Sequence, residues 1–292
     1  MSSPHLKKIL QGVSRSFYLS LILLPRPIRE PISLAFLACK AADTIADTDL
    51  IPRQDRLKIL DAYRELFATQ GDGFAKDIAD AVKQPAGGSP AEKKLIENLP
   101  ALMEALAKLP PADWSLIQEL VLELTQGMQM DLGLTEGLKT EQALEQYTYY
   151  VAGCVGRFWT RMVKQHFGFA ENWGPDVEDL GEKIGKGLQL VNILRDLPRD
   201  LEKGRRYIPQ GLLRNRRVLT GRARECLNAY RPYCDFYPWY ACRLKAVVRL
   251  PVRLGFKTLE LLENAGDWLS PAKIHKVSRR QVYQTLLSSL LR

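Results

Sequence analysis

The sequence predicts an all-α protein. Strand signals are almost absent, because the chain has no alternating runs of Val, Ile or Thr and no Asn-Gly turn between such runs. Apolar residues instead recur three and four positions apart, the spacing that places them on one face of a helix. No internal repeat of fixed period is visible, which argues against a helical solenoid. We therefore expect a single domain of many helices over residues 1–292.

Helical patterns follow one another along the chain, separated by prolines and glycines. The apolar stretch 17–24 is followed by Pro25, Pro27 and Pro31, which break regular structure, so the first clear pattern starts at Ile32 and runs to Asp47. A Pro/Gly/Ser loop is expected at 84–90, and a basic tail follows Ser270. Further helices are expected at 54–67, 94–109, 114–131, 141–166, 177–200, 212–219, 222–249 and 254–265. Within 141–166, Gly153 and Gly156 are small enough to permit close approach of another element.

Composition and net charge limit the classes of partner that the protein is expected to bind. Hydrophobic residues at 46% and charged residues at 26% are ordinary for a soluble globular protein. The net charge of +9 favours an anionic partner such as nucleic acid, an anionic lipid surface or a phosphorylated metabolite, or it reflects only a solvated basic surface. No binding motif or concentrated basic stripe supports nucleic acid.

The cysteines and the apolar runs indicate a cytoplasmic protein. The five cysteines form no CxxC pair, a pattern that fits reduced thiols. Residues 1–8 carry no apolar core with a cleavage site, so no signal peptide is expected. No apolar run reaches the roughly 18 residues needed to span a bilayer, so we expect no transmembrane anchor and at most peripheral membrane contact. The sequence leaves the oligomeric state undetermined.

Two pairs of aspartates share the spacing D-x-x-x-D: Asp43 with Asp47, and Asp196 with Asp200. A single pair is typical of a solvated helix face. Two copies at the ends of apolar helices are not, and carboxylates from two facing helices would form an all-oxygen site that suits Mg²⁺, with Mn²⁺ as a substitute. The neighbouring arginines are the alternative partners of these carboxylates.

Polar and cationic residues accompany both pairs. Gln189 and Asn192 extend the second pair into a polar stripe along an otherwise apolar helix. Arginine grips phosphate oxygens bidentately and lysine acts as a point charge, so the cations fit a diphosphate. Those cations and their neighbours are Ser14, Arg15, Ser16 and Lys40 before the first pair, and Arg195, Arg199, Lys203, Arg205 and Arg206 around the second. A non-catalytic helical partner protein, whose aspartates make only surface ion pairs, is the alternative from another class.

Five ordered motifs carry a resemblance to a known family. They are SRSF at 14–17, DTIAD at 43–47, YTYYVAGCVG at 147–156, NILRDLPRD at 192–200 and GRRYIP at 204–209. With them the chain resembles the squalene/phytoene synthase family, the head-to-head prenyl diphosphate condensing enzymes. The match covers 14–209 and is weaker over the helices and basic tail at 210–292.

The resemblance implies an isoprenoid synthase fold with helices around a central hydrophobic channel. The two aspartate motifs would face each other and bind Mg²⁺ together with two prenyl diphosphates. Tyr147 would stabilise cationic intermediates or steer a proton, which makes it a catalytic residue together with Asp43, Asp47, Asp196 and Asp200. The substrate-binding residues implied in the same way are Ser14, Arg15, Ser16, Phe17, Lys40, Gln189, Asn192, Arg195 and Arg205.

Within the family, residues 14–20 and 147–156 are most similar to the squalene synthase branch. This implies condensation of two molecules of farnesyl diphosphate through presqualene diphosphate, followed by reduction with NADPH to squalene. A phytoene or dehydrosqualene synthase, which uses no reductant, is the nearest alternative. Gly181, Gly185 and Gly187 lie in a helical pattern and form no Rossmann loop, but the resembled enzymes bind NADPH without one. Asn192 and Arg205 are the residues implied to contact NADPH.

Two features depart from the family. Pro198 lies between Asp196 and Asp200, where it removes a helical hydrogen bond and is expected to kink the helix. Eukaryotic squalene synthases carry a C-terminal membrane anchor, whereas none is expected from residues 286–292 here. The basic residues at 273–280 are expected either to be solvated or to touch anionic lipid.

Overall fold

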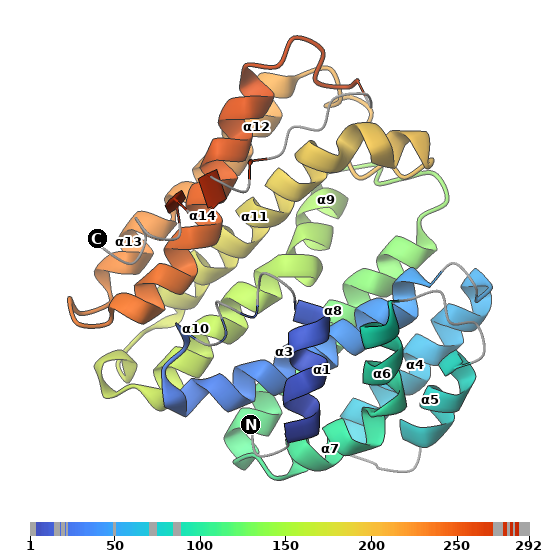
Figure 1. Ribbon diagram of the computed structural model, residues 1–292. Helices are drawn as coiled ribbons and strands as arrows, with labels where there is room; N and C mark the ends of the chain where they lie inside the picture. The colour runs from blue at the N-terminus through green and yellow to red at the C-terminus, as the bar shows by residue number, and fades with distance from the viewer. Residues whose placement is uncertain are drawn as a thin grey trace. The chain divides into compact units, whose positions relative to one another are not determined.

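The computed structural model describes residues 4–14, 18, 21, 23–48, 51–69, 75–83, 89–270, 277–278, 281–282 and 284–285. All regular elements in these ranges are helices, so the expected all-α class is confirmed (Figure 1). Arg15, Ser16, Phe17, most of the 84–90 loop and most of the basic tail lie outside the described residues. The chain divides into two compact units, Met1–Gly133 and Leu134–Arg292, called unit 1 and unit 2 below. The expectation of one domain stays a prediction.

Unit 1 is built around helix α3 (Arg26–Asp47). The other helices of its described part are α1 (Pro4–Ser14), α4 (Arg53–Thr69), α5 (Ala75–Lys83), α6 (Pro90–Glu97), α7 (Leu99–Ala107) and α8 (Pro111–Gly133). Helix α3 packs against α4, α6, α7 and α8, and Leu37 and Phe67 are fully buried between these helices. Tyr63 is buried as well and donates its hydroxyl hydrogen to the Ala38 carbonyl at 2.8 Å, which satisfies a polar group inside the core.

The helix with the first aspartate motif starts earlier than expected. It begins at Arg26 rather than Ile32, and it includes two of the prolines that were predicted to interrupt structure. Pro27 occupies the first turn, where the N–H that proline lacks would have no helical partner anyway. Pro31 lies further in and is buried. The proline-rich segment therefore initiates α3 instead of preceding it.

Unit 2 is organised around α11 (Pro175–Glu202), the long helix that carries the second aspartate motif. The remaining elements are α9 (Glu141–Thr148), the π-helical turn η1 (Tyr149–Gly153), α10 (Cys154–His166), the 3₁₀ turn η2 (Gly168–Ala170), α12 (Arg216–Asn228), α13 (Tyr230–Asp235) and α14 (Cys242–Glu263). Helix α11 packs against η1, α10, α12 and α14 (Figure 1). Its apolar face, which includes Val191, Leu194 and Leu197, is buried in this packing.

Glycines allow α10 and η1 to lie directly against α11. A Cβ atom on Gly156 would lie 2.0 Å from the Gly181 carbonyl oxygen, and one on Gly185 would lie 2.1 Å from the Ala152 carbonyl oxygen. Real Cβ atoms do not come that close, so both positions require glycine. The predicted role of Gly156 in close approach is confirmed. Gly181 and Gly185 lie inside α11 and serve packing, which agrees with the prediction that they form no nucleotide-binding loop.

Several predicted helices are divided in the structure. The pattern at 141–166 contains the π-helical turn η1, a feature that is frequent at functional sites. The pattern at 94–109 divides at Asn98, because Pro100 in the first turn of α7 can start a helix but cannot continue one. The pattern at 222–249 divides into α12, α13 and the start of α14, and Pro238 lies in the second of the two connections. Helix α5 has no counterpart in the prediction.

The described helices also bear on membrane contact. None of them is both long enough and apolar enough to cross a bilayer.

Candidate functional site

The first aspartate motif occupies the last two turns of α3. Asp43 is partly exposed and Asp47 is exposed, whereas Ile45 and Ala46 between them are buried. Residues four apart share a helix face, so both carboxylates lie on the side of α3 that does not enter the core. The sequence favours this arrangement because alanine and isoleucine supply the opposite, core-facing side.

Lys40 binds two carboxylates at this motif. Its Nζ lies 2.5 Å from Oδ2 of Asp43 and 2.9 Å from Oε1 of Glu92. The three side chains are 22%, 41% and 24% exposed, so water screens these ion pairs only in part. Glu92 lies in the first turn of α6 and also accepts a hydrogen bond from the Ser89 N–H at 2.8 Å, as part of a capping box. The start of α6 therefore fixes the position of the carboxylate that holds Lys40.

The electrostatics of this cluster favour charged side chains. Burial disfavours the charged form of Lys40, but hydrogen bonds and charges from Asp43 and Glu92 outweigh it and raise the pKa of Lys40. Burial likewise disfavours ionised Glu92, but Lys40 and the Ser89 N–H outweigh it and lower the pKa of Glu92. At neutral pH Lys40 is therefore an ammonium group and Glu92 is a carboxylate.

The second aspartate motif continues the polar stripe predicted on α11. Gln189, Asp196 and Asp200 are partly exposed and Asn192 is exposed, whereas the neighbouring apolar residues are buried. The Asn192 amide donates to Oε1 of Gln189 at 3.5 Å, a long hydrogen bond that links two members of the stripe. The predicted polar face is therefore present on this helix.

Arg195 forms a bidentate ion pair with the carboxylate of Asp196. Its Nε donates to Oδ1 at 3.0 Å, and its Nη2 donates to Oδ2. The two side chains are 29% and 34% exposed. This bidentate pairing is the geometry in which arginine also binds phosphate. In both motifs, then, the first aspartate is bound by a cation, Lys40 in unit 1 and Arg195 in unit 2.

At the end of α11, a backbone hydrogen bond joins Asp200 and Arg205. Gly204 has φ of +73° and forms the left-handed turn that closes the helix. The Arg205 N–H donates to the Asp200 carbonyl at 2.7 Å, and the Gly204 N–H donates to the Leu201 carbonyl at 3.0 Å, the two bonds of a Schellman motif. Helix α11 runs through the buried Pro198 to Glu202, so this proline does not end it. The second aspartate and the first arginine of the GRRYIP motif are thus held by one helix cap.

Tyr147 connects two of the sequence motifs. Its buried ring stacks on the ring of Tyr207, with centroids 5.1 Å apart and planes inclined by 20°. Tyr207 belongs to the segment after Gly204. Besides the helix cap, a hydrogen bond from the Leu138 N–H to the Arg206 carbonyl at 2.9 Å holds this segment. The YTYYVAGCVG and GRRYIP motifs are therefore in direct contact in unit 2.

A known protein family matches this chain. The family model described as squalene/phytoene synthase matches residues 10–282, nearly the whole chain. The chain belongs to the squalene/phytoene synthase family.

Relatives in this family carry different names. The chain is 33% identical over 205 residues to a presqualene diphosphate synthase from Rhodopseudomonas palustris, a match that covers 70% of this chain and 62% of the relative. It is 30% identical over 213 residues to a phytoene synthase from Thermus thermophilus, covering 72% and 60%. It is 28% identical over 218 residues to a squalene synthase from Gibberella zeae, covering 71% and 44%. The chain therefore spans less than two thirds of the length of each of these relatives.

A solved structure supports the fold. The structure of TcSQS with a ligand superposes with a TM-score of 0.75 at 22% identity, over 98% of this chain and 86% of the other. At this identity the likeness concerns the fold alone, and it confirms the isoprenoid synthase fold that the resemblance implied.

The family motifs can now be placed residue by residue. Lys40 and Asp43 are in contact in unit 1, and Arg195 and Asp196 are in contact in unit 2. Ser14 ends α1, is buried, and donates its hydroxyl hydrogen to the Leu10 carbonyl at 2.5 Å. Arg15, Ser16 and Phe17 lie outside the described residues, and the expected facing of the two aspartate motifs stays a prediction.

The donor groups of both motifs fit magnesium. Within the described residues, no three or more His, Cys, Asp or Glu side chains gather to hold a metal ion by themselves. Mg²⁺ commonly takes one or two protein carboxylates and completes its shell with water and substrate phosphates. The partly exposed carboxylates of Asp43 and Asp196 are oxygen donors of that kind, so they fit an ion that is shared with a diphosphate.

Glu92 and Tyr207 are the residues of these clusters that the sequence analysis did not single out. Ser89-x-x-Glu92 is a visible capping-box signature, but it predicts a helix start and not the ion pair with Lys40. Tyr207 was part of a quoted motif, yet nothing in the sequence indicated that its ring would stack on Tyr147.

Proposed function

We propose that this protein is a squalene synthase. In this proposal it condenses two farnesyl diphosphates head to head through presqualene diphosphate and reduces that intermediate to squalene with NADPH. The observation that supports it most is the repeated pairing of a motif aspartate with a cation, Lys40 with Asp43 and Arg195 with Asp196, in a chain of this family.

The chemistry of ionisation requires such groups. A departing diphosphate carries about three negative charges, and fixed cations stabilise that charge as it develops. Lys40 and Arg195 are hydrogen-bonded to the carboxylates that would bind Mg²⁺. When the diphosphate binds, each cation can donate to phosphate oxygens instead. Bound Mg²⁺ would supply further neutralisation of the leaving group. Arg205, fixed through the helix cap at Asp200, adds a third cation at the second motif.

Tyr147 is suited to act on the hydrocarbon part of the reaction. It is only 6% exposed, and its stacked partner Tyr207 is equally buried, so the pair offers aromatic surface away from water. Aromatic faces stabilise cations, and exclusion of water protects a carbocation from capture. We assign Tyr147 to stabilising cationic intermediates or steering a proton.

NADPH binding is assigned to two residues beside the second aspartate motif. The residues assigned to it, Asn192 and Arg205, are both exposed and border the second aspartate motif. Asn192 offers an amide and Arg205 offers a guanidinium, which are donors that suit the phosphates and amide of a dinucleotide. Isothermal titration of NADPH into the wild type and into Asn192→Ala and Arg205→Ala variants tests this assignment without any turnover.

A second candidate function has its own support. The relative from Rhodopseudomonas palustris is named presqualene diphosphate synthase, and it is 33% identical to this chain. An enzyme of that kind would make presqualene diphosphate as its end product and would need no reductant.

One experiment separates these candidates. The protein is incubated with farnesyl diphosphate and Mg²⁺, with and without NADPH, and the products are identified by mass spectrometry. Squalene that forms only with NADPH supports the main proposal, and presqualene diphosphate under both conditions supports the second candidate. Dehydrosqualene, or a C40 product from geranylgeranyl diphosphate, contradicts both and indicates the phytoene or dehydrosqualene branch. Absence of any turnover would favour a non-catalytic partner protein.

We also propose a cytoplasmic location. All five cysteines are free in the structure, which suits a reducing compartment. Detection of the protein mainly in the soluble and loosely membrane-bound fractions of its native cells would agree with this proposal, whereas resistance to extraction by salt and alkali would contradict it.

A further inference from the structure

The connection between α13 and α14 exposes three large aromatic side chains. Trp239 is 85% exposed, Tyr240 is 62% exposed and Phe236 is 40% exposed. Trp239 and Tyr240 have the largest exposed fractions among the large hydrophobic residues of the described part of the chain. An exposed cluster of this kind marks an interaction site, because single exposed apolar residues are ordinary but contiguous ones are not.

A buried network holds this connection in place. Tyr237, in the middle of the connection, is buried; its hydroxyl accepts from Trp159 Nε1 at 3.0 Å and donates to the Tyr233 hydroxyl at 3.1 Å. The Tyr233 hydroxyl in turn is 2.8 Å from Thr160 Oγ1. The ring of Phe169 contacts both the buried Tyr237 and the exposed Tyr240, whose centroid is 6.3 Å from it. The aromatic side chains are therefore presented from an ordered connection.

Cations lie next to the aromatic connection. Helix α14 carries Lys245, Arg249, Arg253 and Lys257 four residues apart, and no acidic residue precedes Glu260 on it. Like charges at this spacing repel one another, so an anion beside the stripe would lower that repulsion. Lys257 also donates a hydrogen bond to Thr285 Oγ1 at 3.0 Å, and Arg249 is hydrogen-bonded to the Cys234 side chain. Between Ala229 and Leu259 the sequence has six Lys or Arg and one acidic residue, Asp235. The prediction of no concentrated basic stripe is wrong for α14.

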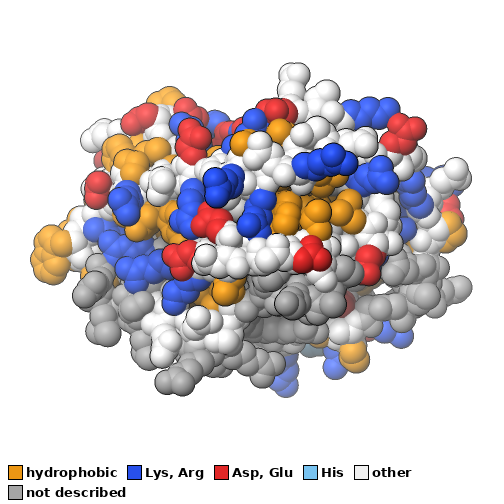
Figure 2. Space-filling view, turned by 90° about the horizontal axis from the view of Figure 1, so that it is seen from above, with side chains coloured by type: hydrophobic (Ala, Val, Ile, Leu, Met, Phe, Trp, Pro, Cys, Tyr) orange, Lys and Arg blue, Asp and Glu red, His pale blue; other side chains and the backbone are white. Residues whose placement is uncertain are grey.

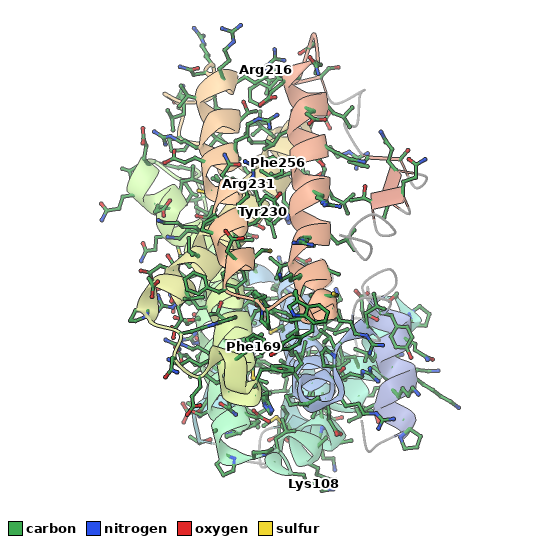
Figure 3. All side chains as sticks on the ribbon, turned by 90° about the vertical axis from the view of Figure 1, so that its left-hand side faces the viewer. Lys108, Phe169, Arg216, Tyr230, Arg231 and Phe256 are labelled. Atoms are coloured by element: carbon green, nitrogen blue, oxygen red, sulfur yellow. The ribbon has the colours of Figure 1, made fainter. Side chains whose placement is uncertain are left out.

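The stripe and the aromatic connection belong to the same edge of unit 2. Burial raises the pKa of the Cys234 thiol, and the charges of Arg249 and Lys245 oppose this rise, so both cations lie near the end of α13. Figure 3 faces this edge: Tyr230 of α13 and Phe256 of α14 lie together, with ring centroids 6.1 Å apart, and Phe169 lies toward the end of α13. Figure 2 shows hydrophobic side chains beside a group of Lys and Arg side chains at its left.

We propose that this edge is a docking surface for a lipid bilayer with anionic headgroups. Trp239, Tyr240 and Phe236 enter the interfacial region, where Trp and Tyr are favoured because their rings are apolar and their N–H or O–H groups are polar. The cations of α14 attract the headgroups at the same time. The proposal concerns a surface away from both aspartate motifs in sequence and does not depend on the proposed reaction.

Charge and ring geometry favour lipid over other occupants. A second copy of the chain would place the same cations against one another, in a protein whose net charge is +9. Single-stranded nucleic acid binds through bases stacked on successive aromatic faces, whereas the rings of Trp239 and Tyr240 are inclined by 82°. A bilayer surface needs neither parallel rings nor a shaped groove.

Vesicle sedimentation with the purified full chain tests the proposal. We expect binding to vesicles of phosphatidylcholine mixed with phosphatidylglycerol, and weaker binding to phosphatidylcholine alone. Trp239→Ala combined with Tyr240→Ala should lower the partition coefficient about tenfold or more. The matched control combines Val218→Ala and Leu261→Ala, two other exposed apolar residues of unit 2, and should bind as the wild type does.

The contribution of charge is tested in the same assay. Lys245→Gln with Arg249→Gln should weaken binding about fivefold for each cation removed. Lys76→Gln with Lys108→Gln changes the net charge equally at exposed positions of unit 1 and should have a much smaller effect. Circular dichroism and thermal melting of each variant verify that the fold is retained.

Depth of insertion gives an independent measurement. Vesicles with brominated acyl chains should quench tryptophan fluorescence of the wild type, and Trp239→Phe should remove most of that quenching while vesicle binding persists. Vesicle binding that is unaffected by the Trp239/Tyr240 change would overturn the proposal. So would quenching that survives Trp239→Phe, binding to single-stranded nucleic acid in place of vesicles, or a shift in the oligomeric state of the free protein caused by the Trp239/Tyr240 change.

Discussion

Lys40 donates a hydrogen bond from Nζ to Oδ2 of Asp43, 2.5 Å away and one turn further along α3. The same ammonium group is 2.9 Å from Glu92 on α6, so it is shared between two carboxylates. This sharing matters for ligand binding, because a cation divided between two anions is more easily displaced from either one than a cation paired with a single anion. In the proposed function, Asp43 would then exchange Lys40 for Mg²⁺.

Replacing Glu92 with Gln tests this exchange. Gln retains the capping box, since either Glu or Gln serves at that position, but it removes one of the two charges that hold Lys40. Lys40 should then pair more tightly with Asp43, and the Mg²⁺ concentration for half-maximal activity should rise several-fold. Glu97→Gln, at the exposed end of the same helix, is the control and should leave the Mg²⁺ dependence unchanged. Equal Mg²⁺ dependence in the wild type and Glu92→Gln would remove Glu92 from this role.

Gly204→Ala tests the cap that joins Asp200 to Arg205. A side chain at φ of +73° is strained, although no neighbouring atom lies within 4 Å of the added Cβ, so we expect a loss of about 1 kcal/mol in unfolding free energy. Reorientation of Arg205 should also weaken diphosphate binding, which inhibition by inorganic diphosphate can measure. Gly211→Ala has similar open space and no positive φ, and it should change neither quantity. Unaltered inhibition in Gly204→Ala would show that the cap does not position Arg205.

Gly156→Ala tests the contact between α10 and α11. The added Cβ would lie 2.0 Å from the Gly181 carbonyl oxygen, and backbone cannot yield as a flexible side chain can. We expect a loss of about 2 kcal/mol or more in unfolding free energy, measured by urea denaturation. Gly168→Ala, where nothing lies within 4 Å of the added atom, should have a small effect and serves as the control. Similar stabilities for the two variants would mean that the helices can separate at little cost.

Glu182 makes the stability of unit 2 sensitive to acid. It is bound by Lys186 at 2.6 Å and Arg157 at 3.1 Å; burial disfavours its ionised form, but these two cations outweigh burial and lower its pKa below the ordinary 4.5. A carboxyl group with a lowered pKa stabilises the fold above its unfolded-state pKa, and this contribution is lost as the pH falls through the lowered value.

The acid limb of thermal stability measures this effect. Glu182→Gln should be less stable than the wild type at pH 7, and the difference should shrink as the pH falls below about 4.5. Glu171→Gln changes an exposed residue in the same unit, and its thermal stability should depend on pH as that of the wild type does. A constant difference between Glu182→Gln and the wild type at all pH values would contradict the electrostatic explanation.

Helical spacing predicted most of the helices, but neither α1 nor α5, and it did not predict the contacts among the motif residues. Helical spacing predicted the stripe of Gln189, Asn192, Asp196 and Asp200, and that stripe lies on one helix. Contacts between distant segments were not predictable, because Glu92 meets Lys40 and Tyr207 meets Tyr147 only after packing.

Proline was the other source of error. Pro27 and Pro31 were predicted to break regular structure, but α3 includes both: Pro27 lies in the first turn, which accepts proline, and Pro31 lies inside the helix. Pro198 was expected to kink α11; the helix continues through it to Glu202, Gly204 forms the turn that ends the helix, and the kink stays a prediction.

The central proposal is that each aspartate motif binds Mg²⁺ together with diphosphate. It is tested most directly by Mg²⁺-dependent release of diphosphate from farnesyl diphosphate in Asp43→Asn and Asp196→Asn variants. Each change should lower the rate by at least about a hundredfold, because a charge needed in the transition state is lost, while circular dichroism remains that of the wild type. Asp77→Asn, at an exposed position of α5, should release diphosphate at the wild-type rate. Full Mg²⁺-dependent release by either motif variant would contradict the account.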